Sequence, residues 1–119
     1  MLGPLLLCDN DPALLSTREM VLTHAGFTAS ICSENDIAAM PQNPAIALAV
    51  MGHSTLPKEQ AAAAELVRAK WPDSKILFLR NSDRNLEQQS NFEYECGSLN
   101  PARLIRACRL ILDSSSASD

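Results

Sequence analysis

Polar side chains that could do chemistry gather in a short acidic turn near the start of the chain. Asp9, Asn10 and Asp11 directly follow the apolar run Leu5–Cys8, and Pro12 comes next. An uninterrupted apolar run is typical of a strand buried on both faces of a parallel sheet. Open α/β folds place their ligand sites at the carboxyl ends of such strands. The sequence therefore predicts a site at this turn, with Asp11 capping a helix that Pro12 opens.

The rest of the chain alternates strand and helix patterns, which predicts the elements that position this turn. We expect strands over Met1–Leu7, Phe27–Cys32, Ala45–Met51, Lys75–Leu79 and Phe92–Leu99. We expect helices over Pro12–Ala25, Glu34–Met40, Lys58–Trp71 and Pro101–Leu112, and at most a short or frayed helix in Arg80–Asn91. In the first helix, Arg18 and Glu19 are predicted to point outward. This order predicts a three-layer, doubly wound α/β fold with a five-stranded parallel sheet and right-handed crossovers.

Length and composition limit the classes of protein to which the chain can belong. Its 119 residues, 46% of them hydrophobic, suit one domain, which we place over residues 1–113 with a disordered tail over 114–119. The apolar start is too short for a membrane span and lacks a signal-peptide pattern, so we expect a cytoplasmic protein without membrane contact. A net charge of −4 and a pI near 5.1 argue against direct nucleic-acid binding.

The four cysteines lack the spacing of a metal site. Cys8, Cys32, Cys96 and Cys108 form no Cys-x-x-Cys pair and have no histidine in a zinc pattern nearby. Reduced, mostly buried thiols in a reducing compartment are therefore favoured over a disulfide or metal framework.

The predicted topology brings polar residues from several strands to one edge of the sheet. The residues that follow strands one, three, four and five are Asp9 with Asn10, His53, Arg80 and Asn100. Because the carboxyl ends of parallel strands meet at one edge, we expect these side chains to share a site there.

Several local motifs, in this order, resemble the receiver domain of bacterial response regulators. They are Leu-Leu-Leu-Cys-Asp-Asn-Asp-Pro (5–12), His-Ala-Gly-Phe (24–27), Leu56-Pro57, Trp71-Pro72 before Lys75–Leu79, and Asn100-Pro101. The resemblance covers roughly Leu5–Leu112. It implies a flavodoxin-like sheet in the strand order 2-1-3-4-5.

The resemblance also implies a chemistry that this sequence departs from at nearly every position. Receivers transfer a phosphoryl group to an aspartate after strand three, using two acidic residues for Mg²⁺, a hydroxyl after strand four and a lysine after strand five. Here the acidic pair corresponds to Asp9 and Asn10, and the acceptor to His53. The hydroxyl position corresponds to Arg80, and the lysine to Asn100. No acidic residue occurs between Asp36 and Glu59 to replace the acceptor. The chain therefore resembles a degenerate receiver, or pseudo-receiver.

Each replaced residue has a structural and a functional interpretation. His53 is either a loop histidine at a strand end, or a phosphohistidine or metal ligand with Asp9 and Asp11. Arg80 is either an exposed strand-end arginine, or it pairs with Asp9 in the space of metal and phosphate and locks one signalling state.

The last helix carries a basic face opposite its apolar stripe. Arg103, Arg106 and Arg109 are spaced three apart, which suits either a solvated surface or contact with an acidic partner. In receivers, the face made by the last two strands and helices is the usual dimerisation and output surface.

These observations together predict a non-enzymatic signalling module of two-component type that works by protein contact without phosphorylation. Its partner would be a kinase, an output domain or a regulator, with a homodimer as a further option. We expect no cofactor, and at most weak Mg²⁺ binding at Asp9 and Asp11. The alternative is a small-ligand or metal-binding domain that uses the pocket of Asp9, Asp11, His53 and Arg80. An enzyme is the weakest interpretation, because the sequence offers no nucleophile–base pair, phosphate loop or zinc motif.

Overall fold

Six strands form one sheet in a computed structural model that describes residues 4–42, 45–52, 56–98 and 100–117. The strands are β1 (Leu5–Cys8), β2 (Ala29–Cys32), β3 (Leu48–Met51), β4 (Lys75–Arg80), β5 (Glu87–Gln88) and β6 (Glu93–Gly97). Their order is β2-β1-β3-β4-β6-β5, and only the β5–β6 pair among them is antiparallel. The predicted order 2-1-3-4-5 is confirmed for the five parallel strands, but the prediction of five strands in all is wrong, because β5 adds a short edge strand.

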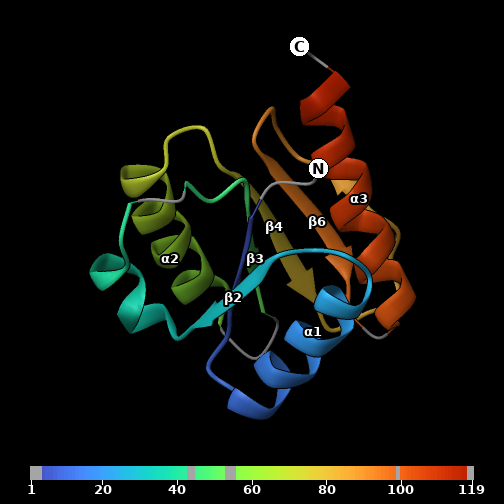
Figure 1. The fold of residues 1–119 in the computed structure, drawn as a ribbon, viewed down its shortest axis with the longest axis horizontal. Helices are drawn as coiled ribbons and strands as arrows, with labels where there is room; N and C mark the ends of the chain where they lie inside the picture. The colour runs from blue at the N-terminus through green and yellow to red at the C-terminus, as the bar shows by residue number, and fades with distance from the viewer. Residues whose placement is uncertain (1–3, 43–44, 53–55, 99, 118–119) are drawn as a thin grey trace.

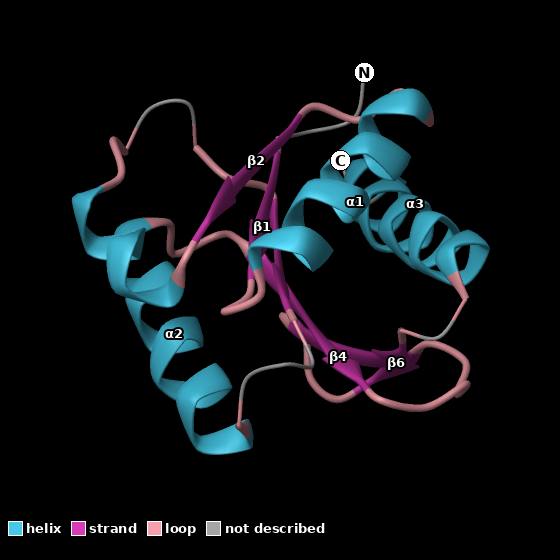
Figure 2. Cartoon of the chain, turned by 90° about the horizontal axis from the view of Figure 1, so that it is seen from below, coloured by secondary structure: helices cyan, strands magenta, loops and turns pink. Residues whose placement is uncertain are grey.

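Helices cover both faces of this sheet. The helical elements are α1 (Pro12–His24), the short 3₁₀ helix η1 (Glu34–Ala39), α2 (Pro57–Lys70) and α3 (Pro101–Ala117). Helices α1 and α3 lie on one face and α2 lies on the other (Figures 1 and 2). The last helix continues five residues past its predicted end at Leu112, so residues 114–117 are helical where a disordered tail is expected.

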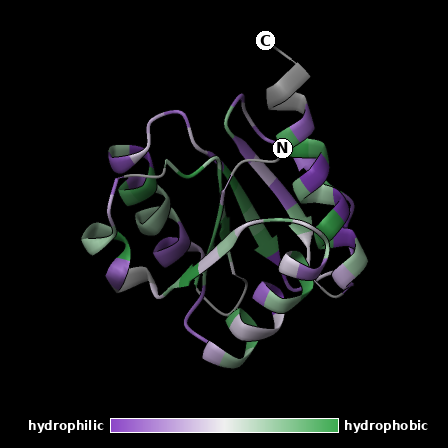
Figure 3. Cartoon of the chain, in the orientation of Figure 1, coloured by the Kyte–Doolittle hydropathy of each residue, from purple (hydrophilic) through white to green (hydrophobic). Residues whose placement is uncertain are grey.

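Alternating residues of the central strands divide the core in two. Leu5 and Leu7 of β1 pack in a cluster with residues of α1 and α3, whereas Leu6 and Cys8 pack with η1 and α2. Successive side chains of a strand point to opposite faces, so a strand covered on both sides must be apolar throughout. The central strands are accordingly among the most hydrophobic segments in Figure 3. Within the described residues, no helix has the length and apolar character needed to cross a bilayer.

The connection between β4 and β6 contains no α-helix among its described residues. The predicted short or frayed helix in Arg80–Asn91 is wrong, because this segment forms a loop and the two-residue strand β5. Only Leu86 in this stretch packs against the core as a partly buried apolar side chain. A segment without an apolar stripe has no face to bury as a helix, which accounts for its extended path.

Two leucines of α3 test which face of this helix holds the fold together. Leu104 is 4% exposed in the core cluster, whereas Leu110 is 52% exposed. Leu104→Ala should lower the free energy of unfolding by about 2–5 kcal/mol, because it leaves a cavity in the core. Leu110→Ala is the matched control and should change it by less than about 0.5 kcal/mol. Urea unfolding measures both, and equal losses would contradict this orientation of α3.

Candidate functional site

Asp9, the first residue after β1, is a buried carboxylate with two partners. Asp9 as a whole is 1% exposed. Its Oδ1 accepts a hydrogen bond from the Asp11 N–H at 3.0 Å, and its Oδ2 lies 2.9 Å from Nη1 of Arg18. The Asp9 side chain is 0% exposed and that of Arg18 is 10% exposed. A buried carboxylate requires such a partner, because removing a charge from water is costly. The charged pair is therefore part of the protein interior.

Arg18 reaches Asp9 from the inner face of α1, so the prediction that it points outward is wrong. It lies three residues after Leu15 and four before Leu22, and all three are buried. Residues at this spacing share one face of a helix. The spacing was thus a usable signal in the sequence, and the charge of Arg18 obscured it.

Gly52, which follows β3, allows the Asp9 carboxylate to lie over the end of that strand. The Gly52 N–H donates to the carbonyl of Cys8 at 2.7 Å, which holds the ends of β1 and β3 together. A Cβ atom on Gly52 would lie 1.8 Å from Oδ2 of Asp9, far inside contact distance. A side chain at position 52 is therefore incompatible with the observed place of Asp9. The next residue, His53, lies outside the described residues.

Arg80, at the end of β4, makes neither of the two arrangements that the sequence left open, since it is neither paired with Asp9 nor simply exposed. Its Nη2 lies 3.1 Å from Oε2 of Glu95 on β6, and its Nη1 donates to Oε1 of Gln60. The guanidinium also lies 5.6 Å from the centre of the Phe78 ring. The sheet order explains the difference, because β3 separates β4 from β1 whereas β6 is the direct neighbour of β4.

Gln60 of α2 is a buried polar residue that the sequence analysis did not single out. It is 1% exposed, and its Nε2 donates to the carbonyls of Gly52, Leu79 and Met51 at 2.8, 3.3 and 3.4 Å. The amide therefore joins the carboxyl ends of β3 and β4. Gln60 precedes buried residues Ala63, Ala64 and Val67 by three, four and seven positions, a spacing that places it on the inner face of α2.

Of the three other predicted site residues that the structure describes, two make local contacts. Asn10 is exposed, and Asp11 caps α1 as predicted, since its Oδ1 accepts from the N–H groups of Ala13 and Leu14 at 3.0 and 3.3 Å. Asn100 caps α3 as predicted, since its Oδ1 accepts from the Ala102 N–H at 2.9 Å. Asp11 and Asn100 therefore engage the N-termini of their own helices.

The donors at this edge do not fit the magnesium site that the resemblance implies. Mg²⁺ needs carboxylate oxygens in octahedral geometry, but Oδ2 of Asp9 faces a guanidinium and Oδ1 of Asp11 faces backbone N–H groups. Among the described residues, no three His, Cys, Asp or Glu side chains gather closely enough to hold a metal.

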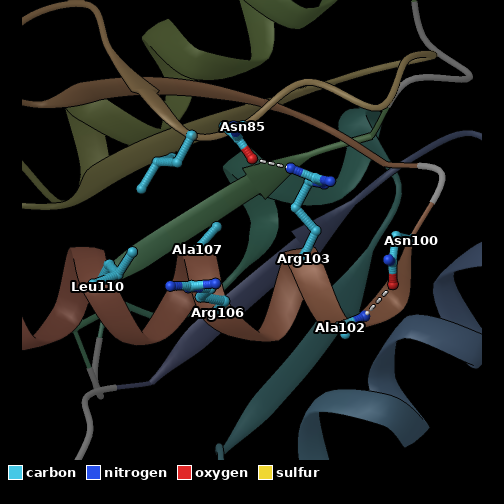
Figure 4. A pocket seen from close by; sticks show the side chains of 8 residues that line it. Asn85, Asn100, Ala102, Arg103, Arg106, Ala107 and Leu110 are labelled. Atoms are coloured by element: carbon cyan, nitrogen blue, oxygen red, sulfur yellow. Dashed lines mark hydrogen bonds between the residues drawn. The ribbon is translucent and has the colours of Figure 1, made fainter.

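The arginines of α3 do not form a uniform basic face. Nη2 of Arg103 lies 3.0 Å from Oδ1 of Asp83, and Arg103 also donates to Asn85. Arg109 turns to the end of α1, where its Nη2 donates to the Ala25 carbonyl at 2.9 Å. Arg106 is exposed and lines a hollow of about 520 Å³ between α3 and the β4–β6 connection. Figure 4 shows Arg103 reaching across this hollow to Asn85, with Arg106 and Leu110 farther along α3.

Comparisons with known proteins identify the fold. No protein-family model matches the chain, and no curated protein matches it. Among solved structures, it is similar to a CheY-like response regulator receiver domain from Methanospirillum hungatei JF-1, with 17% identity, a TM-score of 0.72 and complete coverage (100%) of both chains. A receiver domain from Clostridium thermocellum has 12% identity and a TM-score of 0.74, covering 99% of this chain and 100% of its own. A structure of a histidine kinase in complex with a response regulator protein gives 16% identity and a TM-score of 0.69. The match covers 92% of this chain and 98% of the other. The chain therefore has the flavodoxin-like fold of response regulator receiver domains, as the sequence predicted.

The Asp9–Arg18 pair can be tested by removing one partner and then both. Arg18→Met should lower the free energy of unfolding by about 3–5 kcal/mol, because it leaves the Asp9 charge buried without a cation. The double variant Asp9→Asn, Arg18→Met should recover most of this loss, since Asn keeps an oxygen for the Asp11 N–H. Urea unfolding of the wild type, the two single variants Asp9→Asn and Arg18→Met, and the double variant completes the cycle. If the two single losses of unfolding free energy simply added in the double variant, a direct pairing would be contradicted.

The bridging amide of Gln60 can be tested by an apolar residue of similar size. Gln60→Leu should lower the free energy of unfolding by roughly 1–3 kcal/mol, because buried carbonyls lose their donor. Gln89→Leu, at an exposed position, is the control and should be near neutral. If Gln60→Leu were as stable as the control, Gln60 would not join β3 to β4.

Proposed function

We propose that the chain is a receiver-like signalling module that works by protein–protein contact, independently of phosphorylation and without enzymatic activity. The observation that carries this proposal is the buried pair of Asp9 and Arg18. By resemblance to receivers, Asp9 corresponds to a magnesium ligand. In this chain its Oδ2 already has the guanidinium of Arg18 as a partner. The positive charge that Mg²⁺ would supply is thus built into α1.

The other positions of the site support the same proposal. Arg80, at the hydroxyl position, is held by Glu95 and Gln60, and Asn100, at the lysine position, caps α3. Neither side chain supplies the group that engages a phosphoryl oxygen in receivers, and an amide carries no charge to stabilise one. The sequence adds that no acidic residue lies between Asp36 and Glu59. The phosphoryl cycle would therefore lack its acceptor and its supporting groups together.

Partner contact is expected at the hollow beside α3. Leu110 and Arg106 are exposed there, and the described β4–β6 connection leaves this flank of α3 without a covering helix. An apolar side chain beside an arginine suits an acidic, amphipathic partner segment. Amide hydrogen exchange on the chain bound to its partner should show protection in residues 103–110. A footprint confined to the far face, over α2, would contradict this assignment.

The loss of phosphorylation can be tested on the isolated chain. After incubation with acetyl phosphate and Mg²⁺, intact-mass spectrometry should show no phosphoryl adduct, whereas a receiver with its acceptor aspartate, treated in parallel, should show one. An adduct on this chain would contradict the proposal, and one stable to base but labile to acid would assign it to His53. Such a result would indicate an unorthodox but working phosphorelay domain.

The replacement of Mg²⁺ by Arg18 has its own test. Mg²⁺ should leave the melting temperature of the wild-type chain unchanged and raise that of Arg18→Met, because the metal can then take the place of the guanidinium beside Asp9. The double variant Asp9→Asn, Arg18→Met lacks the carboxylate and should lose this response. A response of the wild-type chain as large as that of Arg18→Met would show that Arg18 does not compete with the metal.

A further inference from the structure

Two thiols meet at the carboxyl ends of neighbouring strands. Cys8 ends β1 and Cys32 ends β2, and the two residues are direct partners in the parallel register. Their Sγ atoms lie 3.7 Å apart. Adjacent strands are about 4.8 Å apart, which falls within the Cα separation of about 4.4–6.8 Å that a disulfide spans. The backbone therefore already holds the pair at a distance that a disulfide bond can close.

The two thiols differ in exposure as a reacting pair requires. Cys32 is half-buried and therefore keeps part of its surface in contact with solvent, whereas Cys8 is 2% exposed. The hydrogen bond with Cys8 lowers the pKa of the Cys32 thiol, against the opposing effects of burial and of Asp36. A thiol with more thiolate character and access to solvent is the one that oxidants attack first.

The remaining cysteines provide an internal contrast. Cys96 and Cys108 are 1% and 0% exposed in the core between the sheet, α1 and α3. Burial raises the pKa of the Cys96 thiol to about 11 and that of Cys108 to about 12. Both thiols are therefore protonated and shielded at neutral pH, and they serve as controls for the reactivity of the first pair.

We propose that Cys8 and Cys32 form a redox-modification site, in which a peroxide converts the two thiols into an intramolecular disulfide. The Cys32 thiolate attacks one peroxide oxygen, the O–O bond breaks, and Cys32 becomes a sulfenic acid as the peroxide is reduced. The Cys8 sulfur then attacks the Cys32 sulfur, forming the S–S bond and releasing water. In balance, two thiols and one hydrogen peroxide give one disulfide and two waters, and a dithiol reductant reverses the change.

The place of this bond connects it to the edge described above. Cys8 directly precedes Asp9, and Cys32 directly precedes Ser33, the residue before η1. A disulfide would draw the two strand ends together beside the buried charge pair. The contact between β1 and β2 that forms this site does not depend on the proposed function.

The test is to oxidise the folded chain with hydrogen peroxide and follow its intact mass. The expected result is the loss of two hydrogen atoms per chain, a peptide map that links Cys8 to Cys32, and reversal by dithiothreitol. Cys32→Ser should abolish the loss, and because this position is half-exposed the variant should still fold. The control variant Cys96→Ala, Cys108→Ala should lose the two hydrogens as the wild type does.

Three results would overturn the proposal. One is oxygen added at Cys32 with no link to Cys8. Another is a link that forms only between separate chains on a non-reducing gel. The third is a link that forms faster in denaturant than in the folded protein, because the fold would then not bring the sulfurs together.

Discussion

A single buried charge fixes three distant parts of the chain. Asp9 takes its carboxylate out of water at the end of β1, and that cost requires a cation and hydrogen-bond donors nearby. Arg18 must therefore lie on the inner face of α1, and the turn must present the Asp11 N–H. The residue after β3 must lack a side chain to leave room for the Asp9 carboxylate, so position 52 holds glycine. The acidic turn, the first helix and the third strand are thus matched to one side chain.

A second set of polar contacts closes the same edge on the other side of β3. The amide of Gln60 joins the carbonyls that end β3 and β4, while Arg80 connects Gln60 to Glu95 of β6. Arg18 and Arg80 at this edge both have acidic partners from the chain itself, which are Asp9 and Glu95. Among the described residues of this edge, the charged side chains of Asp9, Arg18 and Arg80 are therefore each partnered within the chain.

The sequence predicted the framework well and the contacts of the site poorly, for one physical reason. Apolar runs such as Leu5–Cys8 report burial directly, so the strands, their order and the helix caps at Asp11 and Asn100 follow from local patterns. The partner of a side chain on another element depends on which faces of the two elements meet. No local sequence pattern indicates the partner of Arg80. Its partner Glu95 was set by the neighbouring strand in the sheet.

The buried polar residues of the helices were not predicted, although the sequence contains a signal for them. Arg18 and Gln60 both occupy helix positions whose neighbours at three and four residues are buried. A polar side chain on an apolar stripe is costly unless it has a partner, so its position there is itself a signal of a specific contact. Polarity alone places such residues outside, whereas spacing places them inside, and at both positions spacing was right.

The β4–β6 connection shows the opposite case, in which polarity and spacing agree. Its residues carry no apolar stripe, so the segment makes a loop and a two-residue strand where a helix would need a face to bury. Arg103 joins this loop to α3 through Asp83 and Asn85, and it lines the same hollow as Leu110. The described contacts therefore include ion pairs at the carboxyl edge of the sheet, whereas α3 carries a hollow lined by the exposed Arg106 and Leu110.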